Sequence, residues 1–221
     1  MVEIKELLDL DKTIAKELFD GKTYPWEVLD GIKDFILKLG PTLDANEFDN
    51  PSEGVWVAKD AKVFPSAYLG APCIIDHGAE IRHCAFIRGS AIVGKNAVVG
   101  NSVELKNVVL FDNVQTPHYN YVGDSVLGYK AHMGAGAVTS NVKSDRTLVS
   151  VRAGDEVLET RLKKMGAILG DRVEVGCNSV LNPGTVIGAD SNIYPLSSVR
   201  GTVPPRCILK SGKGTEIVEK Q

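Results

Sequence analysis

The chain of 221 residues is long enough for one generous domain or two small ones, and 43% hydrophobic residues suit a buried core, which excludes a disordered tail. Lys and Arg total 25 against 28 Asp and Glu, so the net charge of −3 excludes a general attraction to nucleic acid or to an acidic membrane, and any anion site must be local. The N-terminus lacks a signal pattern, and no apolar run approaches the roughly 18 residues of a membrane span. We therefore expect a cytoplasmic protein with its four cysteines as free thiols.

Residues 1–50 are predicted to form a helical segment of two amphipathic helices. Apolar residues fall near helical spacing from Leu7 to Leu18, and again between Pro25 and a stop at Gly40. The following residues, 41–54, are rich in Asp, Asn, Pro, Ser and Gly and are predicted to be a linker. The apolar stripes indicate helices that cap or flank a core, and partner binding is the alternative.

A six-residue repeat then decides the fold class. One run of aliphatic residues has this spacing from Val57 to Leu105, and a second runs from Leu169 to Val199. A small residue, mostly Ala or Ser, follows most of them four positions later. Neither a helix of period 3.6 nor a strand of period 2 produces this pattern, so each hexad is predicted to be one short strand and one tight turn.

Such hexads bury their side chains only if the chain coils and stacks strand upon strand, which predicts a parallel β-helix over residues 51–205. Residues 117–138 keep a strained version of the repeat, and we expect about six or seven coils. Residues 139–164 break the period and are predicted to be an extruded loop, and residues 206–221 a C-terminal tail. Long insertions in a solenoid emerge on one face, which is often the binding face.

Arg88 and Lys106 are one coil apart if a coil has eighteen residues, and both directly follow an inward aliphatic residue. Two cations stacked at one strand spacing are unfavourable unless an anion lies beside them, which predicts a phosphate-sized site. The alternative is a solvated pair with nearby counter-charges such as Glu104.

The segment from Thr116 to Asp124 interrupts the repeat with His118, an Asn and two Tyr. Polar and aromatic residues in place of structural hexad residues indicate a site. An imidazole with an ordinary pKa of about 6.5 can take a proton from an attacking amine near neutral pH, so His118 is a candidate general base. A structural or surface histidine is the alternative.

The hexads resemble the left-handed β-helix of the hexapeptide-repeat acyltransferases. From Arg88 to Asn141 the chain resembles the acetyltransferase half of the bifunctional glucosamine-1-phosphate acetyltransferase/N-acetylglucosamine-1-phosphate uridylyltransferases, in their archaeal-type sugar-1-phosphate branch. The matching stretches are Gly100-Asn101-Ser102-Val103-Glu104-Leu105-Lys106, His118-Tyr119-Asn120-Tyr121-Val122-Gly123-Asp124-Ser125, Gly134-Ala135-Gly136 and Asn141. The resemblance implies a left-handed triangular coil of three hexads and a homotrimer with active sites between subunits. The fold class is therefore mainly β, with a short N-terminal helical segment.

For the site, the resemblance implies an acetyl-CoA-dependent N-acetyltransferase of an amino-sugar 1-phosphate. Arg88 and Lys106 would hold the phosphate, His118 would be the general base, and Tyr121 and Asn141 would position the sugar. Ala135 would lie beside the acetyl thioester, with its backbone N–H as an oxyanion donor. The basic residues on or beside the extruded loop would meet the phosphates of acetyl-CoA, although a solvated basic loop is an equal alternative: Lys143, Arg146 and Lys163.

At position 132 this family usually has Asn, whereas this chain has His132. The acceptor stays open among glucosamine 1-phosphate, galactosamine 1-phosphate and a nucleotide-linked amino sugar. The first 50 residues are too short for a nucleotide-binding domain and lack a Gly-rich phosphate loop, so we expect no uridylyltransferase activity.

Two other functions stay open. A non-catalytic β-helix scaffold is one, because one fold hosts many functions. A metal-dependent hydratase resembling the γ-class carbonic anhydrases is the other, but it needs three imidazoles that converge on zinc, and the spacing of the histidines does not match that family. We therefore expect no metal.

Overall fold

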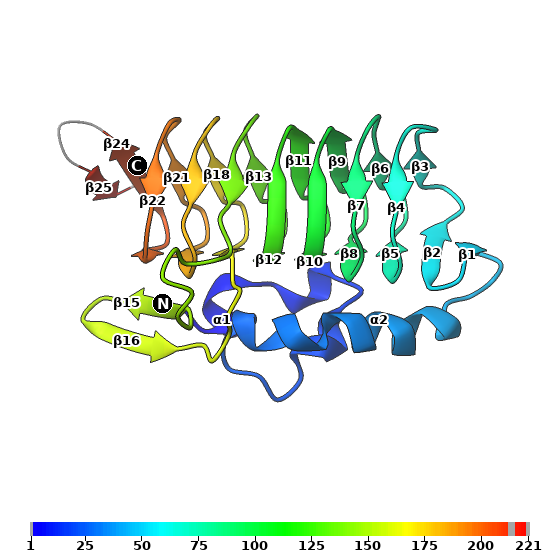
Figure 1. Cartoon of the computed structure of the whole chain (residues 1–221), viewed down its shortest axis with the longest axis horizontal. Coiled ribbons are helices and arrows are strands. Elements are labelled where there is room, and N and C mark those ends of the chain that lie inside the picture. The colour runs from blue at the N-terminus through cyan, green and yellow to red at the C-terminus, as the bar shows by residue number, and fades with distance from the viewer. Residues whose placement is uncertain (1, 212–214, 220–221) are drawn as a thin grey trace.

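A computed structural model describes residues 2–211 and 215–219, and it is a left-handed parallel β-helix with a helical N-terminal segment along one side (Figure 1). The predicted fold class is confirmed. Each coil contributes strands to three faces, which we name the His118 face, the Arg88 face and the covered face. Among the described residues, no helix is long and apolar enough to cross a membrane.

The His118 face is a sheet of parallel strands with a hairpin strand at its end. Its parallel strands are β3 (Lys62–Val63), β6 (Glu80–Ile81), β9 (Val98–Asn101), β11 (Gln115–His118), β13 (His132–Met133), β18 (Glu174–Val175), β21 (Asn192–Ile193) and β24 (Cys207–Ser211). These eight described strands correct the expectation of six or seven coils, which ended the β-helix at residue 205 and so left out β24. β25 (Thr215–Glu219) pairs antiparallel with β24.

The other two faces share one sheet. The Arg88 face contains β4 (Tyr68–Leu69), β7 (Phe86–Ile87), the first halves of β10 (Glu104–Leu110) and β12 (Tyr121–Leu127), β14 (Val138–Thr139), β19 (Val180–Leu181) and β22 (Ser198–Val199). The covered face contains β2 (Val55–Ala58), β5 (Cys73–Ile75), β8 (Ala91–Val93), the second halves of β10 and β12, β17 (Ala167–Leu169), β20 (Thr185–Ile187) and β23 (Thr202–Val203). β1 (Phe48–Ser52) pairs antiparallel with β2 at the first coil.

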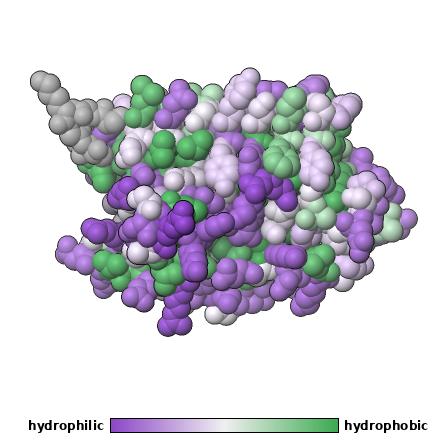
Figure 2. Space-filling model, viewed as in Figure 1, coloured by the Kyte–Doolittle hydropathy of each residue, from purple (hydrophilic) through white to green (hydrophobic). Residues whose placement is uncertain are grey.

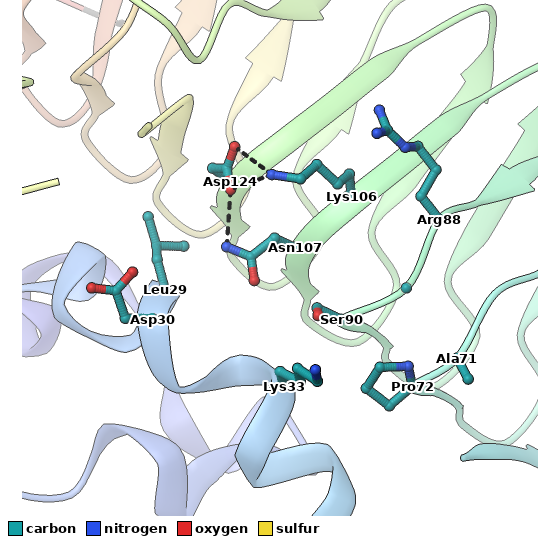
Figure 3. Close-up of a pocket in the computed structure, with 11 residues that line it drawn as sticks. Leu29, Asp30, Lys33, Ala71, Pro72, Arg88, Ser90, Lys106, Asn107 and Asp124 are labelled. Atoms are coloured by element: carbon teal, nitrogen blue, oxygen red, sulfur yellow. Dashed lines mark hydrogen bonds and ion pairs between the residues drawn. The ribbon is translucent and has the colours of Figure 1, made fainter. Parts of the chain in front are cut away.

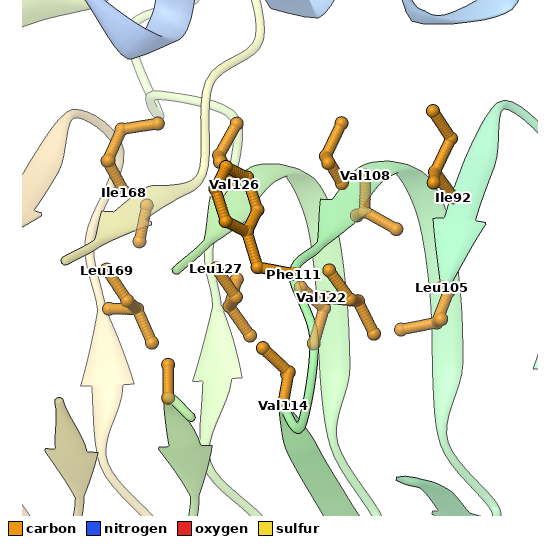
Figure 4. Packing of buried hydrophobic residues seen from close by; sticks show 14 of the residues in the cluster. Ile92, Leu105, Val108, Phe111, Val114, Val122, Val126, Leu127, Ile168 and Leu169 are labelled. Carbon is orange, nitrogen blue, oxygen red and sulfur yellow. The ribbon is translucent and has the colours of Figure 1, made fainter. Parts of the chain in front are cut away.

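Inward hexad side chains form the core of the β-helix. Leu105 pairs in register with Ile87 on one side and Val122 on the other, and all three are fully buried. Figure 4 shows such stacked rows crossing from coil to coil. The chain turns between faces at residues with positive φ, such as Ser90, Asn107 and Asp124, whose φ values are 51°, 54° and 48°. Short polar side chains tolerate this left-handed conformation better than most residues.

The covered face is apolar on its outer side as well. Its outward side chains Ile74, Ile92, Val108, Val126 and Ile168 are almost completely buried beneath the N-terminal segment. The last four form the upper row of Figure 4. Against them pack η3 (Pro25–Gly31) and α2 (Ile32–Leu39), and Phe19 meets Phe111 edge to face at 5.7 Å between ring centroids. The outer surface of this segment is mostly hydrophilic (Figure 2). It therefore packs on the β-helix of its own chain.

The first predicted N-terminal helix is wrong. Its region instead contains α1 (Ile4–Leu7) and two 3-10 turns, η1 (Leu10–Lys12) and η2 (Lys16–Phe19). The Asp9 side chain accepts from the Asp11 N–H, which starts a new turn, and Thr13 is extended. Short polar side chains of this kind offer the backbone local hydrogen bonds that compete with a helix.

The second predicted helix is present as η3 followed by α2, and α2 ends at Gly40 as expected. A Cβ on Gly40 would lie only 2.4 Å from ring atoms of Trp56, so this close approach needs glycine. Gly40 also begins a short 3-10 turn, η4 (Gly40–Thr42).

Two further segments bear on the expected boundaries. β24 pairs in parallel with β21, so the β-helix runs past residue 205 to Ser211; Leu209 lies one hexad after Val203 and is buried. The extruded loop leaves after β14, carries the hairpin of β15 (Ser150–Ala153) and β16 (Glu156–Glu159), and returns at β17. At its neck the Met165 N–H donates to the Asn141 carbonyl oxygen at 3.0 Å.

Candidate functional site

Arg88 and Lys106 are neighbours on the Arg88 face, one coil apart as predicted, because Leu105 pairs with Ile87. The structure gives each cation a carboxylate of its own. The Arg88 guanidinium donates to Glu104 Oε1 at 2.8 Å, and Lys106 Nζ donates to Asp124 Oδ1 at 3.1 Å. The hydrogen bond with Glu104 raises the pKa of Arg88. Both cations therefore have a counter-charge beside them, and their role in binding a phosphate stays a prediction.

Asp124 is the centre of a hydrogen-bonded group that includes Lys106, Asn107, Asn141 and Tyr121, which we call the charged network. No role for Asp124 was expected from the sequence. This residue is only 4% exposed and accepts hydrogen bonds from Lys106, from Asn107 Nδ2 at 3.0 Å and from Asn141 Nδ2. Its backbone carbonyl oxygen also accepts from the Gly166 N–H at 2.8 Å, so it ties the loop neck to the β-helix. An acidic residue one coil after Asn107, at the end of the polar segment, was the available signal.

Tyr121 and Asn141 belong to the same network. Asn141 Nδ2 donates to the Tyr121 hydroxyl at 3.1 Å, besides its hydrogen bond to Asp124. Burial, followed by the nearby Asp124 carboxylate, raises the pKa of Tyr121, so its hydroxyl stays protonated at neutral pH. The structure therefore brings together all four residues expected to bind the sugar phosphate: Arg88, Lys106, Tyr121 and Asn141.

A cavity of about 430 Å³ lies where the Arg88 face turns toward the N-terminal segment (Figure 3). The β-helix contributes Arg88, Ser90, Lys106, Asn107 and Asp124 to its lining, together with the Ala71-Pro72 turn. The opposite wall comes from η3 and α2 of the N-terminal segment. The cavity is thus continuous with the charged network and lies within the size range of small-molecule sites.

His118 lies at the end of β11, across one corner of the coil from Tyr121, and is exposed. The buried Asn120 side chain at this corner accepts from the His118 N–H at 3.2 Å and donates to the carbonyl oxygens of Gly134 and Ala137 at 2.8 and 3.0 Å. It therefore joins His118 to the turn that contains Ala135 on the next coil. In the sequence, Asn120 was recognisable only as part of the polar cluster that interrupts the repeat.

Ala135 lies next to His118 along the helix axis, since the following Gly136 N–H donates to the His118 carbonyl oxygen at 3.0 Å. Among the described residues, the Ala135 N–H has no acceptor, so it is available to a ligand. Its position therefore allows the oxyanion role that the resemblance implies.

The loop cations Lys143, Arg146 and Lys163 lie near the neck of the extruded loop. Lys143 donates to Thr147 and pairs with Asp145 at 3.4 Å, while Arg146 and Lys163 are exposed. All three are within five residues of the loop neck, which follows β14, whereas Ala135 precedes that strand. Among the described residues, no hydrogen bond or ion pair joins these cations to the turn that contains Ala135.

The other histidines are dispersed. His77 Nδ1 lies 2.9 Å from Asp60, His132 Nδ1 lies 2.7 Å from Glu174, and the His83 ring packs on Phe64 at 4.4 Å between centroids. Within residues 2–211 and 215–219, no group of three His, Cys, Asp or Glu is placed to hold a metal ion. The converging imidazoles that the hydratase alternative requires are thus not found in the described part of the chain.

Comparison with known proteins agrees with the resemblance read from the sequence. The chain is 35% identical over 95 residues to a protein of Sulfurisphaera tokodaii named bifunctional sugar-1-phosphate nucleotidylyltransferase/acetyltransferase, covering 43% of this chain and 24% of that protein. It is also 35% identical over 85 residues to bifunctional protein GlmU of Methanococcus maripaludis, covering 38% of this chain and 20% of that protein. The chain thus covers less than a quarter of either relative.

Among solved structures, the polySia-specific acetyltransferase NeuO aligns with a TM-score of 0.49 and 12% identity, over 72% of this chain and 80% of that one. The model of the family described as the GMPPB C-terminal domain matches residues 69–191. This match spans more than half of the sequence and includes the charged network and His118, and the chain therefore belongs to the GMPPB C-terminal domain family.

Proposed function

We propose that the protein is an acetyl-CoA-dependent N-acetyltransferase acting on an amino-sugar 1-phosphate, either glucosamine 1-phosphate or galactosamine 1-phosphate. The observation that carries the proposal is that Arg88 lies one coil from Lys106, which Asp124 joins to Asn141 and Tyr121, all on the face one coil corner from His118. Cations suit a phosphate, amide and hydroxyl groups suit sugar hydroxyls, and an imidazole suits an amine proton. The acetyltransferase named in the Sulfurisphaera tokodaii relative supports the reaction class.

In the proposed reaction, His118 takes a proton from the amine of the sugar as the nitrogen attacks the carbonyl carbon of acetyl-CoA. The negative charge that develops on the carbonyl oxygen is stabilised by the Ala135 N–H. The C–S bond then breaks, an amide forms, and the CoA thiolate receives the proton held by His118. No covalent enzyme intermediate is needed. Cys73 does not suit the role of a nucleophile, because it is buried in the core and burial raises the pKa of its thiol to about 12.

Acceptor binding in this proposal requires an exchange of partners. The phosphate would replace Glu104 as the partner of Arg88, while Lys106 would remain held in place by Asp124. Tyr121 and Asn141 would meet the sugar hydroxyls. Because Asp124 already fixes Lys106 and Asn141, the site needs little rearrangement to receive the sugar.

The position of the loop cations supports assembly as a homotrimer. Lys143, Arg146 and Lys163 belong to the loop that leaves after β14, whereas Ala135 comes before that strand. In a trimer, the loop of a neighbouring copy would meet the phosphates of acetyl-CoA, while Ala135 and His118 meet its thioester. Acetyl-CoA and the amino-sugar phosphate are the proposed small-molecule partners.

The first test is thiol release from acetyl-CoA with glucosamine 1-phosphate and galactosamine 1-phosphate. We expect His118→Ala to lower kcat at least roughly a hundredfold, as the loss of a general base does. His83→Ala is the matched control, because His83 is an exposed histidine in the same column of the β-helix and should leave kcat unchanged. If acetyl-CoA binds but neither sugar reacts, the acceptor is wrong. If acetyl-CoA does not bind, the protein is a scaffold rather than an enzyme.

A further inference from the structure

The N-terminal segment forms one wall of the cavity beside Arg88 and Lys106. Leu29 and Asp30 come from η3, and Lys33 comes from α2. Figure 3 shows Lys33 on the side of Ser90 and Pro72, whereas Asp30 lies on the side of Asp124. The segment that covers the β-helix therefore also reaches the proposed phosphate site.

The charges around this cavity are not equivalent. Arg88 is paired with Glu104, and Lys106 with Asp124. Lys33, in contrast, has no ion pair or hydrogen bond to its side chain among the residues that the structure describes. An anion that enters can pair with the Lys33 ammonium without displacing a carboxylate, which makes this the readily available cation of the cavity.

We propose that Lys33 binds a phosphate group of the acceptor, so that the N-terminal segment is part of the substrate site. The acceptor's identity rests on the proposed function. The phosphate can belong to a sugar 1-phosphate or to the diphosphate of a nucleotide-linked amino sugar. A cavity of about 430 Å³ has room for more than one phosphate group. The family match begins at residue 69, so this contact belongs to a part of the chain outside the matched domain.

Binding of glucose 1-phosphate, which lacks the reactive amine, tests the proposal without turnover. We expect Lys33→Ala to raise the Kd for glucose 1-phosphate by about fivefold at low salt, which is the size typical of a partly solvated charge pair. Lys33→Arg should restore the wild-type Kd. Lys38→Ala is the matched control, because Lys38 is also an exposed lysine of α2 but does not line the cavity. The Lys33 effect should shrink as the salt concentration is raised to about 0.5 M, which a structural role would not show.

A parallel titration with UDP-glucose separates the two phosphate sources. If Lys33→Ala loses more affinity for UDP-glucose than for glucose 1-phosphate, Lys33 is assigned to a diphosphate. If it loses more affinity for glucose 1-phosphate, Lys33 is assigned to the sugar 1-phosphate. Equal Kd values for Lys33→Ala and Lys38→Ala with both probes overturn the proposal, as does a wild-type protein that binds neither. If the wild type binds them through Lys33 but releases no thiol with any amino-sugar phosphate, only the proposed function fails.

Discussion

The covered face and the Arg88 face are built from the same coils, yet their outer surfaces are opposites. On the covered face, the outward residues Ile92 and Val108 are aliphatic and lie beneath the N-terminal segment. On the Arg88 face, the corresponding positions are Arg88, Glu104 and Lys106, which remain accessible. The inward hexad residues are alike in both, so the outward residues decide whether a face is covered by protein or left open to a ligand.

The first prediction tests the packing of the N-terminal segment on the covered face. Ile92→Asp would place a carboxylate without a partner under the N-terminal segment, and we expect the free energy of unfolding to fall by more than about 4 kcal/mol. Leu37→Asp is the control, because Leu37 lies on α2 but is 44% exposed. Urea unfolding measures both variants. Similar losses for the two would contradict the packing of this segment on the covered face.

The second prediction removes the centre of the charged network. Asp124→Ala would leave Lys106, Asn107 and Asn141 without their shared acceptor. Because Lys106 remains 28% exposed and can recover some hydration, we expect a loss of about 2 kcal/mol in the free energy of unfolding. Asp124→Asn keeps a short side chain that tolerates positive φ and should lose less. Thermal or urea unfolding measures the stability of both variants. A larger loss for Asp124→Asn than for Asp124→Ala would contradict a contribution of the positive-φ turn to stability.

The third prediction tests whether the Arg88 face is available to an anion. Glu104→Gln would free the Arg88 guanidinium from its carboxylate, so the Kd for glucose 1-phosphate should fall by about threefold, with little change in unfolding, as expected for an exposed pair. Glu80→Gln provides the control, because Glu80 pairs with Arg82 in the same way on the His118 face. Calorimetric titration gives both values. Equal Kd values for the two variants would show that Glu104 does not compete with the anion.

The smallest expected effect is a pH dependence beside the covered face. Asp76 is fully buried, its Oδ2 has no hydrogen-bond partner among the residues that the structure describes, and burial raises its pKa. The folded state therefore holds the proton more tightly than the unfolded state. The tighter binding of the proton stabilises the folded state at pH values below the ordinary pKa of 3.8, and this stabilisation is lost as the pH rises through the raised pKa of Asp76. The stability of wild type relative to Asp76→Asn should fall with pH across that window in urea titrations, whereas a constant difference would contradict the burial of a titrating carboxyl.

Sequence periodicity predicted much of the fold and part of the site. It placed Arg88 and Lys106 one coil apart, and the polar interruption of the repeat marked His118, whereas the family resemblance supplied Tyr121 and Asn141. The structure joins Lys106, Tyr121 and Asn141 through Asp124 in one hydrogen-bonded network. Arg88 lies one coil from Lys106 and is paired with Glu104. The periodicity did not assign Asp124, whose importance depends on three partners from different coils. It also gave the N-terminal helices no relation to the cavity.

The β-helix can be predicted from the amino-acid sequence alone, because hexad spacing is a local property that fixes which side chains point inward. Two other features are visible only in the folded chain: Lys33 lines the same cavity as Arg88 and Lys106, and Asp124 joins the loop neck to the charged network. These contacts depend on how the N-terminal segment and the loop return to the β-helix. A repeat pattern does not encode such returns, because they arise from packing between residues far apart in the chain.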